Sequence, residues 1–131
     1  MINFTSPILV RVPRKTKSDK KVYLNMNIYR NLHHYTNNQA KVIYRNLMFE
    51  QLHNVKIKTP IEISFRYFKG TKRKSDKANV LSIVEKFFCD ALIHYGCIED
   101  DNDDIIKTTV YLPTVYDKGN ARVEIAVKEI K

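Results

Sequence analysis

Acidic side chains flank one long stretch of the chain, residues 76–104. Asp76 opens the stretch, and five acids lie within six residues at its end: Glu99, Asp100, Asp101, Asp103 and Asp104. Lys86 and Asp90 stand between these acidic positions. Carboxylate oxygens are the ligands that Mg²⁺ prefers, and a nearby lysine can neutralise charge that develops on a reacting phosphate. These residue types therefore predict a divalent-metal site for chemistry on phosphodiesters, with metal ligands from Asp76 and Asp101, joined by Asp100 or Asp90.

A helix is predicted between the two acidic positions, because apolar residues repeat there at helical spacing for about four turns. The apolar stripe consists of Val80, Ile83, Val84, Phe87, Phe88, Ala91, Leu92 and Tyr95. A polar ridge beside it consists of Asn79, Ser82, Lys86 and Asp90. Gly96 is predicted to end the helix, since glycine enters the left-handed conformation without a Cβ clash.

The same stretch resembles the signature of the RusA family, the Holliday junction resolvases of phages and prophages. The resemblance is carried by Asp76, Asn79, Lys86, the triplet Asp90-Ala91-Leu92, Gly96 and the pair Asp100-Asp101. It implies that Asp76, Lys86 and Asp101 are catalytic. It also implies a Mg²⁺ cofactor, with Mn²⁺ as a substitute, and a homodimer that cuts a four-way DNA junction symmetrically.

The chain departs from the family pattern at two positions. Ala78 stands where the family has its second acid, and Lys86 lies about one helical turn beyond the usual position of the lysine. If residue 78 belongs to the metal site, the missing carboxylate predicts weaker metal binding. Instead of a catalytic role, Lys86 could have a structural one, in an ion pair with Asp90, four residues further along the helix.

Charge predicts a nucleic-acid partner. The chain has 23 Lys and Arg against 14 Asp and Glu, a net charge of +9. Because five of the acids are confined to residues 99–104, the rest of the surface is strongly basic, and basic surfaces attract polyanions. The alternative is a merely soluble cationic protein.

Two segments and one helix supply candidate nucleic-acid contacts. The stretch from Asn25 to Asn38 is rich in Asn, His and Tyr, which donate to phosphates or stack on bases, although a capped loop is an equal interpretation. Residues 69–77 form a basic loop that would lie on the phosphate backbone or simply in solvent. The candidate residues are Arg30, His33, His34, Lys41, Lys72, Arg73, Lys74 and Lys77.

Length and periodicity predict a single domain over residues 1–131, with a mixed α/β or α+β fold. The expected order is β-β-α-β-α-β-β, with one mixed sheet and two main helices. The expected strands cover residues 8–12, 22–26, 61–67, 108–112 and 123–127, and the expected helices cover residues 36–52 and 76–95. The first helix would start from Thr36 or Asn37 as its N-cap.

The sequence also predicts where the protein is located. The sequence lacks an apolar run long enough for a membrane span and a signal-peptide pattern, so a cytoplasmic protein without a membrane partner is expected, and the resemblance implies a phage or prophage origin. Cys89 and Cys97 are interpreted as reduced thiols, because they lack zinc-site spacing.

The main alternative to a nuclease is a junction-binding protein of the same fold without catalysis. An unrelated RNA-binding protein is a weaker one, since no aromatic RNP strand motif is present.

Overall fold

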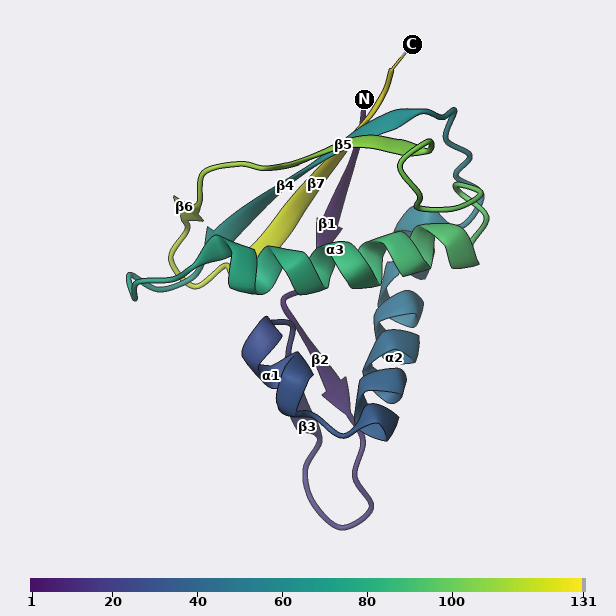
Figure 1. Cartoon of the computed structure of the whole chain (residues 1–131). Helices are drawn as coiled ribbons and strands as arrows, with labels where there is room; N and C mark the ends of the chain where they lie inside the picture. The colour runs from purple at the N-terminus through teal and green to yellow at the C-terminus, as the bar shows by residue number, and fades with distance from the viewer. Residues whose placement is uncertain (131) are drawn as a thin grey trace.

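A mixed sheet forms one layer of the molecule (Figure 1). The computed structural model describes residues 1–130, and the sheet order in these residues is β1-β7-β4-β5, with β6 added beside β4. The strands are β1 (Ile2–Ser6), β4 (Ile61–Lys69), β5 (Ile106–Tyr111), β6 (Val115–Tyr116) and β7 (Arg122–Glu129). β4 pairs antiparallel with β7 and parallel with β5 and β6.

The helix α3 (Lys77–His94) connects the parallel strands β4 and β5 and lies across one face of the sheet (Figure 1). Parallel strands require such a crossover, which explains why the longest apolar-periodic segment stands between them. The predicted end of α3 is confirmed. Gly96 has a φ of 69°, and the Cys97 and Gly96 amides donate to the carbonyls of Leu92 and Ile93 in the Schellman pattern.

A second layer covers the other side of α3. It contains the hairpin of β2 (Leu9–Val12) and β3 (Lys20–Tyr23), the short helix α1 (Met26–Asn31) and the long helix α2 (His34–Leu52). Because β2 and β3 pair only with each other in the described chain, the expectation of a single sheet is wrong. The expected order also lacked β1, α1 and β6.

Neighbouring aromatic residues show why α3 is buried on two sides. Phe88 packs against Phe4 and Phe65 of the sheet, with ring centroids 5.4 and 6.4 Å away. Phe87 packs against Tyr29 of α1 and Tyr44 of α2, at 6.3 and 5.6 Å. One core cluster therefore joins both layers, and α3 is its middle element.

The predicted core of the helices is largely confirmed. In α2 the buried residues are Ala40, Tyr44, Met48 and Leu52. Leu47, expected on the same face, is 53 % exposed. Within residues 1–130, none of the helices combines the length and the apolar character needed to cross a membrane.

Candidate active-site cleft

A polar cleft of about 580 Å³ opens between α3, the edge strand β5 and the loop that joins them. Lys41 of α2 closes one side. The charged or polar lining residues are Lys41, Ser82, Glu85, Lys86, Asp90, Asp101, Asp103, Thr109 and Tyr111, together with Cys89 and Ile106. Side chains from α2, α3, the loop after α3 and β5 thus meet at one concave surface.

Helical spacing explains the contribution of α3. Ser82, Glu85, Lys86 and Cys89 follow one another at i, i+3, i+4 and i+7, so one face of the helix presents them all. Ser82, Lys86 and Asp90 are three of the four residues of the predicted polar ridge, and the structure places all three on the cleft.

The fourth ridge residue, Asn79, holds the fold together instead. Its Oδ1 accepts a hydrogen bond from the Met26 amide at 3.1 Å, which ties the beginning of α1 to the first turn of α3. Asn25 then caps α1 by accepting from the Ile28 amide at 2.9 Å.

The cleft has more acidic than basic side chains although the chain is basic. Burial and then the charges of Glu85, Asp101 and Asp90 raise the pKa of the Cys89 thiol to about 12. Burial also raises the pKa of Tyr111, and so does its hydrogen bond to Glu85, in which the Tyr111 hydroxyl donates to Oε1 at 2.5 Å. Both phenol and thiol stay protonated at neutral pH, so the negative charge of the cleft comes from its carboxylates.

The two lysines at the cleft have different neighbours. Lys41 Nζ lies 4.0 Å from Asp90 Oδ2, so α2 and α3 are linked by an ion pair beside the cleft. Lys86 Nζ lies 5.9 Å from the centre of the Tyr29 ring of α1, within the range of a cation–π contact. The alternative ion pair between Lys86 and Asp90 is therefore replaced by these two separate contacts.

Asp76 is placed far from this cluster. It caps α3, and its Oδ1 accepts from the Ala78 amide at 3.1 Å. Because a helix rises 1.5 Å per residue, Asp76 lies about 15 Å along the axis from Lys86 and about 21 Å from Asp90. The structure of one chain does not bring Asp76 together with Asp101, and Ala78 in the first turn of α3 lies at the same distant end.

Asp100 shapes the acidic loop rather than lining the cleft. Its two carboxylate oxygens accept from the Asp101 amide at 2.8 Å and from the Asn102 side chain at 2.9 Å. The carboxylates that enter the cleft from this loop are those of Asp101 and its neighbour Asp103.

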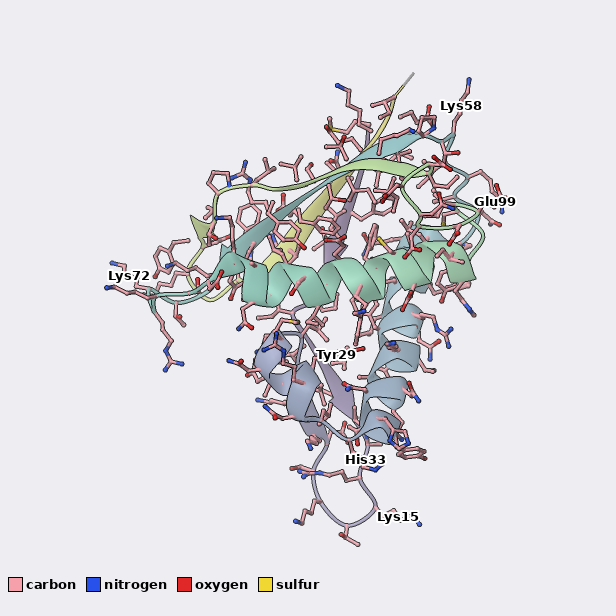
Figure 2. The ribbon with its side chains drawn as sticks, in the orientation of Figure 1. Lys15, Tyr29, His33, Lys58, Lys72 and Glu99 are labelled. Atoms are coloured by element: carbon pink, nitrogen blue, oxygen red, sulfur yellow. The ribbon has the colours of Figure 1, made fainter. Side chains whose placement is uncertain are left out.

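The basic loop 69–77 lies at the opposite end of α3 from the acidic loop. Figure 2 shows Lys72 beyond the first turn of α3 and Glu99 beyond its last. Lys72 Nζ lies 5.7 Å from the centre of the Tyr116 ring, and Lys72, Arg73 and Lys74 are exposed. The loop is therefore about 27 Å, the length of the 18-residue α3, from the acidic loop.

The remaining nucleic-acid candidates lie in the second layer. Arg30 is exposed in the last turn of α1, and His33 caps α2 by accepting from the Tyr35 amide at 3.2 Å. The ring centroids of His33 and His34 lie 4.3 Å apart. Adjacent side chains within a regular helix or strand would diverge, but His33 is the N-cap and lies outside the regular part of α2. Figure 2 shows His33 at the end of α2 remote from the sheet. Among the basic candidates, Lys41 is the one that lines the cleft.

Magnesium-type cations match the donors of the cleft. Asp90, Asp101 and Asp103 supply carboxylate oxygens, and the buried Ser82 Oγ has no hydrogen-bond partner among the described residues. Residues 1–130 contain no group of three or more His, Cys, Asp or Glu side chains already placed to hold a metal ion. Because Mg²⁺ usually takes only one or two carboxylates and completes its shell with water and phosphate, the donors fit a cation that binds together with a phosphate.

No protein-family model matches the chain, and no match is found among curated proteins. A function for this chain is inferred from the cleft itself and from the resemblance of residues 76–104.

Among the ionisable residues that line the cleft, those not selected from the sequence as site residues are Glu85, Cys89, Asp103 and Tyr111. Glu85 could have been found, since it shares the helix face of Ser82 and Cys89. Tyr111 could not, because its place opposite Glu85 depends on the register of β5 against β4.

Proposed function

We propose that the protein is a Mg²⁺-dependent structure-selective endodeoxyribonuclease that resolves Holliday junctions or other branched DNA. One observation carries the proposal: a basic chain concentrates Asp90, Asp101 and Lys86 in one cleft. Carboxylates beside bound phosphates are unfavourable unless a cation lies between them, so this combination favours metal-assisted chemistry on a nucleic acid.

Asp101 and Asp90 are the residues proposed to hold the cation, with Ser82 Oγ available to a bound water. The bound cation would polarise the scissile phosphate and lower the pKa of an attacking water. Lys86 would neutralise the negative charge that develops on the phosphate oxygens in the transition state. The Tyr111 hydroxyl, by donating to Glu85, keeps that carboxylate fixed at the wall of the cleft.

Lys41 is proposed to change partners when substrate binds. In the free protein it neutralises Asp90 across 4.0 Å. A cation on Asp90 would take over that role, and the lysine would then be free to contact a DNA phosphate.

A homodimer, a bacterial cytoplasmic location and a phage or prophage origin belong to the same proposal. Their support is the resemblance of residues 76–104 to the RusA family. Symmetric cutting of a four-way junction requires two active sites, and one chain has one such cleft among its described residues.

The decisive experiment uses a synthetic four-way junction with Mg²⁺ or Mn²⁺. Paired nicks at symmetric positions are expected, and the Asp101→Asn protein serves as the control for contaminating nucleases. A linear duplex of the same sequence should be cut far more slowly. Absence of nicking at every concentration of either metal would reject the nuclease.

A second function, junction binding without catalysis, is favoured by one observation. Asp76, the first acid of the family motif, lies away from the cleft, and residues 1–130 have no preassembled three-carboxylate group. Tight binding of the junction without nicking would establish this function in place of the first.

A further inference from the structure

A second hollow adjoins the acidic cleft on the other side of the Lys41–Asp90 ion pair. It has a volume of about 320 Å³ and lies between α2 and α3. Its walls are Lys41, Arg45, Phe87, Asp90, Ile93 and His94. Lys41 and Asp90 also line the cleft, so the two depressions form one continuous surface across the two helices.

Donors from both helices converge in this hollow. Arg45 Nη1 of α2 lies 3.2 Å from His94 Nδ1 of α3. A guanidinium has donors and no acceptor, so His94 Nδ1 must accept this bond, and the hydrogen of the imidazole then sits on Nε2. Arg45 and His94 therefore present N–H donors together, and neither offers an acceptor that would repel an anion.

The pair is held in place by Tyr95. The Tyr95 hydroxyl donates to the Arg45 carbonyl oxygen at 2.7 Å, which fixes the backbone of α2 against the end of α3. The His94 and Tyr95 rings pack edge to face, with centroids 4.9 Å apart at 85°. Donors that are already oriented lose little freedom when they bind a ligand.

Charge balance favours an anion in the hollow. Asp90 is the carboxylate on its wall, and Lys41 neutralises that charge. The charge of Arg45 is left uncompensated on the wall, above a floor of Phe87 and Ile93. A guanidinium over an apolar floor attracts phosphate more strongly than one in bulk water.

We propose that Arg45 and His94 form a phosphate-binding subsite that holds the DNA backbone next to the acidic cleft. The proposal rests on the proposed function, because it takes the ligand to be the strand whose neighbouring phosphate enters the cleft. The chemistry of recognition is that of a phosphodiester oxygen, which accepts hydrogen bonds from a guanidinium and an imidazole N–H.

The test measures binding of a fluorescent four-way junction by anisotropy, in EDTA so that no cutting occurs, over a series of KCl concentrations. Arg45→Ala keeps the carbonyl that Tyr95 binds, and it is expected to weaken binding about tenfold, the size of a lost charge-assisted hydrogen bond. The plot of log K against log[salt] should lose about one unit of slope. His94→Ala, at an exposed position, should weaken binding about fivefold.

Lys128→Ala is the matched control, because it removes the same charge from β7. Val127 and its alternate neighbours Ile125 and Val123 are buried under α3, so Lys128 lies on the opposite face of the sheet. Its effect on binding should stay below about twofold, since screening weakens distant charges. The double variant Arg45→Ala/His94→Ala should be little weaker than Arg45→Ala, because contacting residues are not additive.

Equal effects of Arg45→Ala and Lys128→Ala, with unchanged melting temperatures, would overturn the subsite. So would a loss of binding that appears with a single-stranded RNA and not with the junction. Nicking by the wild-type protein separates the two proposals. A protein that nicks while Arg45→Ala binds normally keeps the nuclease and loses the subsite, and one that binds through Arg45 without nicking keeps the subsite and loses the nuclease.

Discussion

Asp101 is the residue whose replacement tests the cleft most directly. Asp101→Asn keeps the size of the side chain and removes the charge that would hold the cation. Cleavage should fall by at least about a hundredfold, as expected for loss of a metal-holding group. Junction binding should be unchanged or tighter, since one negative charge leaves a surface that meets a polyanion. Nicking and gel-shift assays on the same preparation check both; equal loss of binding and cleavage would contradict the assignment.

Two substitutions of Asp76 separate its role as the N-cap of α3 from a role of its charge in cleavage. Asp76→Ala should lower the free energy of unfolding by about 1 kcal/mol, because the first turn of α3 loses its N-cap. Asp76→Asn should change that free energy by only a few tenths of a kcal/mol, because asparagine caps equally well. Denaturant unfolding measures both.

Cleavage by Asp76→Asn then decides the role of the charge. Because Asp76 lies about 15 Å along the helix from Lys86, the asparagine variant is expected to keep cutting. A stable variant that binds junctions without cutting them would assign this carboxylate to the chemistry, as the resemblance implies.

Cys89 makes stability depend on alkaline pH. Burial and neighbouring carboxylates raise its pKa from 9.0 to about 12 in the folded chain, so the folded protein keeps a proton that the unfolded chain releases. Its contribution to stability is complete below about pH 9 and is lost as pH rises toward 12, by at most about 1.4 kcal/mol per pH unit. Unfolding of wild type and Cys89→Ala between pH 8 and 11 measures this: the wild type should lose more stability over that range. Parallel pH dependences would contradict the buried thiol.

Helix α1 depends on a side chain from another element. All six of its residues are at least partly exposed, and Asn79 of α3 accepts the hydrogen bond of the Met26 amide. Asn79→Ala should therefore reduce the protection of α1 amides from hydrogen exchange, by about 1 kcal/mol. Asn27→Ala is the control, because the exposed Asn27 side chain in α1 makes no hydrogen bond among the described residues. Similar protection in both variants would show that Asn79 does not hold this helix.

The elements that sequence patterns predicted are those with a strong period. Helices α2 and α3 and strands β2, β4, β5 and β7 were all located, because their apolar residues face one core. Helix α1 was missed, since its stability comes from Asn79 and from Tyr29 packing on Phe87 rather than from an apolar stripe. The two-residue β6 carries no period. In β1 the buried positions are Phe4 and the polar Ser6, whose hydroxyl forms a hydrogen bond with the Tyr44 hydroxyl, so an apolar alternation is missing.

Helical periodicity also explains which part of the cleft was predicted from the sequence. Helical spacing put Ser82, Lys86 and Asp90 on one ridge, and the structure brings Asp101 to that ridge. The acidic loop follows the C-terminus of α3 in the sequence, but helical spacing could not say that the loop would bring Asp101 back to this ridge. The weaker metal binding predicted from Ala78 assumed that Asp76 and residue 78 converge with Asp101. One chain does not make this convergence, because Asp76 and Ala78 lie at the beginning of α3 and Asp101 follows its end.

At the scale of the whole molecule, basic charge predicts salt-sensitive binding. The uncompensated lysines and arginines should displace several counterions from DNA, so log K should fall with log[salt] with a slope magnitude above about 2. Replacing Lys72, Arg73 and Lys74 together by alanine should reduce that slope if the strand crosses the whole length of α3. Anisotropy titrations with the junction measure it, and a flat plot for the wild type would mean that the charge is incidental.

The distance between the basic loop 69–77 and the acidic loop at the other end of α3 sets the size of the DNA contact. Because α3 separates them by about 27 Å and a strand advances about 3.4 Å per nucleotide, a backbone that touches both would span about eight nucleotides. Junction arms shorter than this should lose the contribution of Lys72, Arg73 and Lys74.

The pairing of β1 with β7 has a consequence for rearranging the chain. Ile2 lies opposite Val127, so the first and last strands are neighbours, at the sheet edge farthest from β5 and the cleft (Figure 1). A short glycine-serine linker would be long enough to join them, and new ends could be opened in the exposed loop of residues 13–19. Such a circular permutant would keep every element pairing described above, and its cleft would still carry Asp101 and Lys86.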